Sequence, residues 1–469
     1  MMPSQPNILF IVLDTLRRDR LGIYGHKLPA SPRLDDFAAQ ATRFDRAVAP
    51  AQWTIPSHIS MFTGTYPGEH QVVQGNSQLS GAYATAAEIL QLGGYHTAAF
   101  CNNPLVGALD NGLQRGFAEF YNYASAVPQR PNEAQRSRLY REWMRRLRPF
   151  ARRVGNQFAR HDWLFRISLH PTWVPIWSKY INFKGNTVSS IGDLVDYWQA
   201  YFAGGSDQPL FAFLNLMQPH LPYQPPQQYV DRIAPELRGD RRAYQFMGCF
   251  NADAAAWASP PDPPLEDWQR EVLSAFYDAE IAFQDDQLGR LLDYLQKSKA
   301  LDNTFVIITA DHGEGLGEHD LFGHSFAVHQ ELVHVPLIMR GADRVPVGGH
   351  VAENVSTRRI FHTLLDVAGM QTGSPGNDVR DRSLLNATRG GDPESNLAFT
   401  EAIPPSTFLH VLEHRNPAII DRMRLRLTRR GVYQGNHKLM MAGDTPEALY
   451  DIAADPFETH NLVAEQPQL

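Results

Sequence analysis

The sequence predicts an α/β fold in which helices flank a large, mostly parallel β-sheet. Five apolar runs have the length and composition of buried strands, and they lie at 7–13, 96–100, 210–216, 304–308 and 335–339. Helical patterns separate these runs, and the clearest places Leu288, Leu291, Leu292 and Leu295 at i, i+3, i+4 and i+7. This alternation favours a doubly wound sheet of parallel strands, whose ligands bind beyond the strands' carboxyl ends.

Residues with useful side-chain chemistry follow four of the predicted strands. They are Asp14 after the first run, Asn102 after the second, His220 after the third, and Asp311 with His312 after the fourth. Because the carboxyl ends of parallel strands meet at one edge of a sheet, we expect these side chains to form a single site.

Thr54 lies in the run Trp53-Thr54-Ile55-Pro56-Ser57-His58 and is a candidate nucleophile. A proline can open a helix, and the first amides of a helix favour a bound anion. The alternative is that Thr54 only caps the helix with its hydroxyl. A hydroxyl is a poor nucleophile unless it is activated, and a bound metal ion activates it by lowering its pKa.

Asp14, Asp311 and His312 offer two carboxylates and one imidazole. This mostly hard ligand set suits one divalent metal ion: Mn²⁺, Ca²⁺, Zn²⁺ or Mg²⁺. A lone aspartate at a strand end is more often a cap or an ion-pair partner. Here, however, Asp311-His312-Gly313-Glu314 places two ligands directly after a buried strand. The sequence therefore predicts a metal site that includes Thr54 as a neighbour.

Histidines are concentrated around these segments, and they are His58, His220, His312, His319, His324, His329 and His334. Several follow predicted strand ends or lie in glycine-rich turns, which favours anion binding and protonation of a leaving group. We expect His329 and His334 to be structural.

Composition excludes several classes of protein. The 469 residues carry a net charge of −7, which gives no drive toward nucleic acid, and no nucleic-acid partner is expected. The two cysteines, Cys101 and Cys249, provide neither a disulfide framework nor a thiolate cluster. The N-terminal apolar run is too short for a signal or a membrane span, so we expect a cytoplasmic enzyme.

The pattern changes toward the C-terminus. Met423, Leu425 and Leu427 alternate with arginines, which predicts a half-buried strand, and 432–433 and 438–441 predict further short strands. We therefore divide the chain into a catalytic domain at 1–384 and a small antiparallel α+β subdomain at 385–469.

An insertion at about 128–185 is rich in arginine and aromatic residues, most densely from 130 to 166. Three interpretations are open. The segment is a solvated helical excursion that packs its aromatics on the main domain, a cap over the site, or a basic amphipathic surface that meets anionic lipid or a polyanionic substrate.

At these residues the chain resembles the sulfatase branch of the alkaline phosphatase superfamily over nearly its whole length. The matching segments are 13–19, 54–58 with 63–70, 218–223, 311–324, and the closing elements 449–451, 455–458 and 461–462. The resemblance implies an alkaline phosphatase-like fold, a mixed but mostly parallel sheet with a small C-terminal subdomain.

The resemblance also implies a role for each candidate residue. Asp14, Asp311 and His312 would hold the metal with Thr54 as its neighbour; Thr54, His58, His220 and His324 would be catalytic; Asn102 and His319 would bind substrate. His58 stands in place of an arginine, and Asn102 in place of a lysine. Two-metal relatives carry an Asp with a His four residues later; Asp278 lacks this pattern and Asp320 has it with His324, so a second metal stays open.

Departures from the family pattern indicate the substrate. Sulfatases convert a Cys or Ser at this position into formylglycine, whereas Thr54, together with Thr15, His58 and Asn102, departs from that pattern. Threonine nucleophiles occur in relatives that act on phosphorus. We expect a metal-dependent hydrolase of phosphodiesters or phosphonate monoesters that forms a phospho-threonine, acts on a small anionic ester and is a homo-oligomer. The alternatives are a sulfuric ester hydrolase, a head-group phosphotransferase and a non-catalytic binding protein.

Overall fold

The computed structural model describes residues 5–124, 127–131, 137–161, 163–164, 167, 170, 172–174, 183–253, 258, 263–341, 344–371 and 378–466. Its strands are β1 (Asn7–Leu13), β2 (Thr42–Val48), β3 (His96–Cys101), β4 (Glu119–Asn122), β5 (Leu210–Leu216), β6 (Thr304–Thr309), β7 (Gly315–Leu316), β8 (Phe322–Gly323), β9 (His334–Arg340), β10 (His350–Ser356), β11 (Leu397–Ala402), β12 (Arg429–Gln434), β13 (His437–Ala442) and β14 (Thr445–Asp451).

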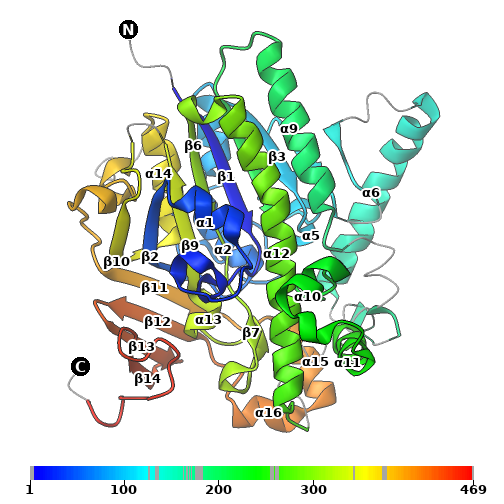
Figure 1. Ribbon diagram of the computed structural model, residues 1–469, viewed down its shortest axis with the longest axis vertical. Helices are drawn as coiled ribbons and strands as arrows, with labels where there is room; N and C mark the ends of the chain where they lie inside the picture. Colours follow the sequence, from blue (N-terminus) through cyan, green and yellow to red (C-terminus); the bar gives the residue numbers. More distant parts are fainter. Residues whose placement is uncertain are drawn as a thin grey trace.

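The helices cover both faces of the main sheet (Figure 1). They are α1 (Pro32–Ala38), α2 (Thr54–Thr63), α3 (Pro67–His70), α4 (Ala86–Leu92), α5 (Pro104–Gly107), α6 (Arg138–Arg160), α9 (Thr187–Ala203), α10 (Gln227–Ile233), α11 (Arg241–Ala252), α12 (Asp267–Lys297), α13 (Gln330–Val333), α14 (Ile360–Val367), α15 (Ser406–Arg415) and α16 (Pro417–Arg422). Within the described part of the chain, no helix has the length and apolar character needed to cross a membrane.

The main sheet has eight strands in the order β10-β2-β9-β6-β1-β5-β3-β4, which confirms the predicted α/β class. Every residue of β1 and β5 is buried because helices lie over both faces, and this explains their continuous apolar sequences. The parallel register of β1 and β6 pairs Val12 with Thr309. Two residues further along, Asp14 therefore lies beside Asp311 at the carboxyl edge of the sheet.

Two sequence-based expectations about strands are wrong. The first is that the run at 335–339 is parallel to the other strands: β9 is antiparallel to both β6 and β2. A strand buried on both faces is apolar at every position, so its sequence contains no signal for direction.

The second error is the strand predicted at Met423, Leu425 and Leu427. Pro417 instead opens helix α16, and the chain then turns, with Arg424 at a positive φ of 50°. Leu425 is buried and its amide donates to the carbonyl of Ile420, whereas Leu427 is exposed. The alternating pattern thus arises from a helix end. The strands predicted at 432–433 and 438–441 lie within β12 and β13 and are confirmed.

A second, antiparallel sheet contains β11, β12, β13 and β14 in that order. The predicted boundary near residue 385 falls between α14, which covers the main sheet, and β11. A buried ion pair joins this small sheet to the catalytic part of the chain. The Lys438 ammonium donates to Glu458 and to the carbonyl of Val328, and Glu458 accepts from the Nδ1 of His329 at 2.7 Å.

Removing one partner of this pair should destabilise the protein. Burial alone would raise the pKa of Glu458, but the Lys438 ammonium and His329 lower it to about 2. Lys438→Met leaves a buried carboxylate without its cation and should lower the free energy of unfolding by about 3 kcal/mol, measured by urea denaturation. The exposed-site control Lys27→Met should have little effect.

The pair also predicts a pH dependence. The folded-state pKa of Glu458 lies below its ordinary value of 4.5, so its stabilising contribution is complete above pH 4.5 and decreases as the pH falls toward about 2.

The double variant Lys438→Met/Glu458→Gln should recover part of the stability that Lys438→Met loses. If the double variant is no more stable than Lys438→Met, the coupling between the two groups is absent.

Candidate active site

The three predicted metal ligands converge at the carboxyl edge of the main sheet, and all are fully buried. The Nε2 of His312 lies 3.9 Å from Oδ1 of Asp14 and 3.4 Å from Oδ2 of Asp311. The three ligand atoms lie within 4.8 Å of one another. The β1–β6 register brings the two carboxylates together, and His312 follows Asp311 in the chain.

The hydrogen bonds around this cluster leave one potential ligand atom of each residue free to face the others. Asp14 accepts from the Asn103 amide with Oδ2, and Asp311 accepts from the backbone amides of Thr15 and His312 with Oδ1, at 3.2 and 3.0 Å. Oδ1 of Asp14 and Oδ2 of Asp311 are buried without a hydrogen-bond partner among the described residues. The Nδ1 of His312 donates to the carbonyl of Gly313 at 2.9 Å, so its Nε2 carries the lone pair. This donor set fits a divalent cation.

The electrostatics of the cluster agree with this assignment. Burial and the neighbouring Asp311 carboxylate raise the pKa of Asp14 well above its usual value, and burial raises the pKa of Asp311 to about 7. Burial and His324 lower the pKa of His312 well below its usual value. Two buried carboxylates beside a neutral imidazole are costly without a counter-charge, and a bound cation supplies that charge.

Thr54 is the first residue of α2, and its Oγ1 lies 3.3 Å from Nε2 of His312. The alternative that Thr54 caps the helix is wrong, because Trp53 occupies the cap position and Pro56 is the third helical residue. All ten residues of α2 are buried. The hydroxyl therefore lies beside the metal ligands and at the end of a helix whose first amides have no helical carbonyl to bind.

His58 lies one helical turn after Thr54 and is fully buried. Its Nδ1 donates to the carbonyl of Thr54 at 2.9 Å, and its Nε2 lies 3.4 Å from the side-chain amide of Asn215. Burial lowers the pKa of His58 to about 4. Where the family pattern has a cationic arginine, this chain thus has a neutral ring that orients the Thr54 backbone.

His220 and His324 extend the cluster toward the substrate side. The ring centroids of His324 and His312 are 4.4 Å apart, and those of His220 and His324 are 5.1 Å apart. The Nδ1 of His324 donates to Oε1 of Glu314 at 2.7 Å, and the Nδ1 of His220 donates to the carbonyl of Leu221 at 2.6 Å. Both rings therefore keep Nε2 for a ligand. The role of Glu314 as orienting carboxylate was missed in the sequence, although it lies in the metal motif.

The sulfatase family model matches residues 6–370 of the chain. This protein belongs to the sulfatase family. The resemblance noted in the sequence is thereby confirmed. The family generally uses a divalent metal ion, and Asp14, Asp311 and His312 form a group that could hold one.

Two curated relatives match this sulfatase-family protein over almost its whole length. The uncharacterised sulfatase YidJ of Escherichia coli is 24% identical, with 98% of this chain and 83% of the relative covered. The N-acetylglucosamine-6-O-sulfatase of Bacteroides thetaiotaomicron is 22% identical, with the same coverage.

Solved structures of two phosphonate monoester hydrolases share its fold. The enzyme of Agrobacterium radiobacter superimposes with a TM-score of 0.67 at 23% identity, covering 98% of this chain and 92% of that one. The enzyme of Silicibacter pomeroyi gives 0.66 at 21% identity, covering 99% and 92%.

Two neighbouring asparagines have different surroundings in the sulfatase-family site. Asn103, which sequence reasoning missed, donates to the metal ligand Asp14. The predicted substrate residue Asn102 is fully buried, and its amide donates to Oγ1 of Thr187 at 3.3 Å while its Oδ1 has no partner among the described residues. Adjacent residues of the same type cannot be told apart from sequence, because the side chains leave a strand end in different directions.

Lys184 is a cation at the site that the sequence did not reveal. Its ammonium donates to Glu280 at 2.8 Å and to the carbonyl of Pro222 at 3.1 Å, and its charge acts on both Asp14 and His220. The next residue, Gly185, has a φ of +63°, and a Cβ there would lie 2.8 Å from the Cβ of Asn102. Lys184 is thus held beside Asn102. No local motif marks it, because it reaches the site from the end of the insertion.

His319 does not join the sulfatase metal cluster. Its ring stacks on His329 at 3.7 Å between centroids, and its Nε2 lies 3.8 Å from Glu331. Together with Glu458 these histidines form a separate group of potential ligands. The planes of the two rings are nearly parallel, 7° apart. In the described part of the chain, no potential metal group includes Asp320.

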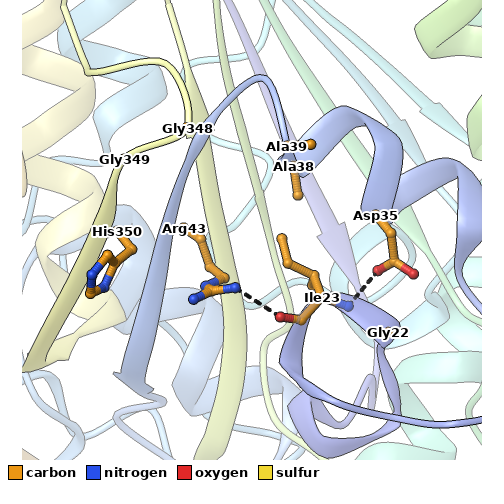
Figure 2. A pocket seen from close by; sticks show the side chains of 9 residues that line it. All are labelled: Gly22, Ile23, Asp35, Ala38, Ala39, Arg43, Gly348, Gly349 and His350. Carbon is orange, nitrogen blue, oxygen red and sulfur yellow. Dashed lines mark hydrogen bonds between the residues drawn. The ribbon is translucent and has the colours of Figure 1, made fainter.

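A pocket of about 550 Å³ lies away from this site (Figure 2). It is lined by Gly22, Ile23, Asp35, Ala38, Ala39, Arg43, Gly348, Gly349 and His350. Arg43 and His350 lie near the N-terminal ends of β2 and β10, which run in the same direction as β1, so the pocket is at the sheet edge opposite Asp14. Figure 2 shows that Asp35 and Arg43 already bind the backbone of Ile23. We therefore do not assign it to catalysis.

Metal binding should stabilise the protein through Asp14. Adding Mn²⁺, Ca²⁺ or Zn²⁺ at a hundred times its Kd should increase the wild-type stability by about 2.7 kcal/mol, measured by scanning calorimetry. Asp14→Asn should abolish this response but should not destabilise the metal-free protein, because it removes one of two buried carboxylates. The exposed control Asp302→Asn should respond like the wild type. An undiminished metal response in Asp14→Asn would remove Asp14 from the site.

Proposed function

We propose that this protein hydrolyses phosphodiesters or phosphonate monoesters with Thr54 as the nucleophile. The observation that carries the proposal is the position of the Thr54 hydroxyl, 3.3 Å from Nε2 of His312 and at the start of α2. A threonine cannot become formylglycine, so its hydroxyl stays available for attack. The fold it shares with two phosphonate monoester hydrolases supports a substrate of the same class.

The buried cluster defines the attacking step. A divalent ion held by Asp14, Asp311 and His312 would lower the pKa of the Thr54 hydroxyl and polarise the ester. The Thr54 hydroxyl releases its proton to solvent as Oγ1 attacks phosphorus, the bond from phosphorus to the leaving oxygen breaks, and a phospho-threonine forms. His58 holds the backbone of Thr54 through its 2.9 Å hydrogen bond and so keeps the hydroxyl in line.

His324 donates a proton to the leaving oxygen. Glu314 accepts from its Nδ1 at 2.7 Å, which orients the ring so that Nε2 can face the leaving oxygen. The proton moves from Nε2 to the leaving oxygen as the ester bond breaks. In the second half-reaction the same nitrogen takes a proton from the water that attacks phosphorus. The bond from phosphorus to Oγ1 breaks, and Oγ1 takes a proton from solvent to restore the Thr54 hydroxyl.

The non-bridging oxygens of the substrate need donors and positive charge. The first amides of α2, the free Nε2 of His220 and the ammonium of Lys184 supply them. This set includes one fixed cation, Lys184, besides the metal ion. It therefore suits a singly charged ester, such as a phosphodiester or a phosphonate monoester, better than a doubly charged phosphate monoester.

Hydrolysis of sulfuric esters is the second candidate. The family itself and the two curated relatives, both named as sulfatases, favour it. A sulfate monoester also carries one negative charge, so charge alone does not separate the two substrates. The difference lies in the nucleophile, because Thr54 has a simple hydroxyl in place of the aldehyde hydrate of sulfatases.

Replacing Thr54 tests the nucleophile and the substrate together. Thr54→Ala should lower kcat for a bis-aryl phosphate or aryl phosphonate by about a thousandfold or more, whereas Thr54→Ser should retain much of it. After a substrate pulse, mass spectrometry of the wild type should show phosphate on the peptide that contains Thr54. An active Thr54→Ala variant would rule out this nucleophile, and aryl sulfate turnover that is faster by orders of magnitude would favour the sulfatase alternative.

Replacing Lys184 tests the substrate cation. Lys184→Met should raise KM for the phosphodiester by ten- to a hundredfold because a charged contact to substrate is lost. Since this change also leaves Glu280 unpaired, the double variant Lys184→Met/Glu280→Gln is the decisive one, with Lys297→Met as a control at an exposed lysine. A wild-type KM in the double variant would show that Lys184 serves only to neutralise Glu280.

A further inference from the structure

Helix α6 presents an apolar stripe to solvent. Figure 1 shows this helix at the edge of the molecule, standing outward from the layer that contains α9. Leu139, Trp143, Phe150 and Val154 are 84%, 60%, 65% and 39% exposed. At 100° per residue, their spacing places these four side chains within an arc of about 60° on one side of the helix.

The body of the protein covers only the adjoining part of the apolar sector. Met144, about 80° beyond this arc by the same geometry, is 5% exposed, and Leu147 between them is half-buried. Further exposed apolar side chains follow the helix, namely Trp163, Ile167 and Trp173. The four aligned side chains on α6 form a larger apolar surface than the scattered exposed residues common on proteins.

Positive charge borders the stripe. The helix contains eight arginines and one acidic residue, Glu142, although the whole chain has a net charge of −7. Of the arginines with described side chains, Arg145 and Arg146 are 76% and 79% exposed, and Arg153 is exposed as well. A strongly basic helix is thus displayed on an otherwise acidic protein.

We propose that α6 docks on an anionic lipid bilayer. The stripe of Trp143, Phe150 and Leu139 inserts at the level of the headgroups, and the exposed arginines beside it bind lipid phosphates. The helix lies in the plane of the membrane, since its arginines prevent it from crossing. Tryptophan favours this interface because its ring is apolar with one polar edge. A second copy of the chain fits less well, because packing two such stripes together would bring their arginines close to one another.

Vesicle sedimentation tests the proposal. The wild-type protein should sediment with vesicles of phosphatidylcholine and phosphatidylglycerol at 7:3, and at least tenfold less with pure phosphatidylcholine. Binding should weaken at high salt because the arginine–phosphate attraction is screened. Equal binding to both vesicles, or no binding to either, would overturn the proposal.

Two pairs of variants assign the binding to α6. Trp143→Ser/Phe150→Ser should lower the affinity for anionic vesicles at least tenfold, whereas Leu92→Ser/Val347→Ser, the same change at residues 88% and 80% exposed elsewhere, should not. Arg145→Glu/Arg146→Glu should act like the first pair, and the exposed control Arg241→Glu should not.

Folding and association are measured on the same variants. Their melting temperatures should match that of the wild type, because every altered side chain is exposed. Wild-type binding by the folded Trp143→Ser/Phe150→Ser variant would overturn the proposal. A wild-type oligomer that this variant dissociates, without any vesicle binding, would instead identify the stripe as an interface between copies.

Discussion

The structure of the site depends on the parallel register between β1 and β6. Pairing Val12 with Thr309 forces Asp14 and Asp311 to lie side by side, both fully buried. A shift by one residue would turn one of the two carboxylates to the other face of the sheet. The predicted metal site therefore requires this register. The strands can hold this arrangement because their other residues are apolar and pack on both faces.

Backbone strain accompanies the site at the same strand end. Thr15, directly after Asp14, has a φ of +56°, which is rare for a β-branched residue. Its amide donates to Asp311, and its carbonyl accepts from the hydroxyl of Tyr277 at 2.6 Å. These contacts hold the strained turn in place. With the backbone in this conformation, main-chain amides bind one oxygen of Asp311 and leave the other oxygen facing His312, as a metal ligand requires.

The fixed charge near Thr54 comes from a distant segment of the chain. Positions 58 and 102 carry a histidine, whose pKa burial lowers to about 4, and a buried asparagine, so neither is a cation at neutral pH. Lys184, from a distant part of the sequence, places one cation near the site. The residue after it, Gly185, packs closely against Asn102. Among His58, Asn102 and Lys184, only Lys184 is a cation, and Glu280 accepts from it at 2.8 Å.

Sequence alone predicted the strands that carry Asp14 and Asp311, because buried parallel strands have continuous apolar runs that end in functional residues. It did not predict the direction of β9, since direction depends on neighbouring strands, or the turn after α16, since six alternating residues also fit a helix end. Within the site, motif residues such as His312 and His324 were predicted. Asn103 and Lys184 were missed, because their roles depend on the angle of one side chain and on a contact between distant segments.

The small C-terminal sheet takes part in the same site through one loop. Lys438 and Glu458 bind Val328, His329 and the amide of Gln330, a few residues after His324. On the other side of the loop, Glu314 binds His324 itself. The ring of His324 is thus fixed between Glu314 and a segment held by the second sheet. Because two buried charges of that sheet have this loop as their partner, the catalytic part of the chain and its C-terminal part must fold as one unit for His324 to be positioned.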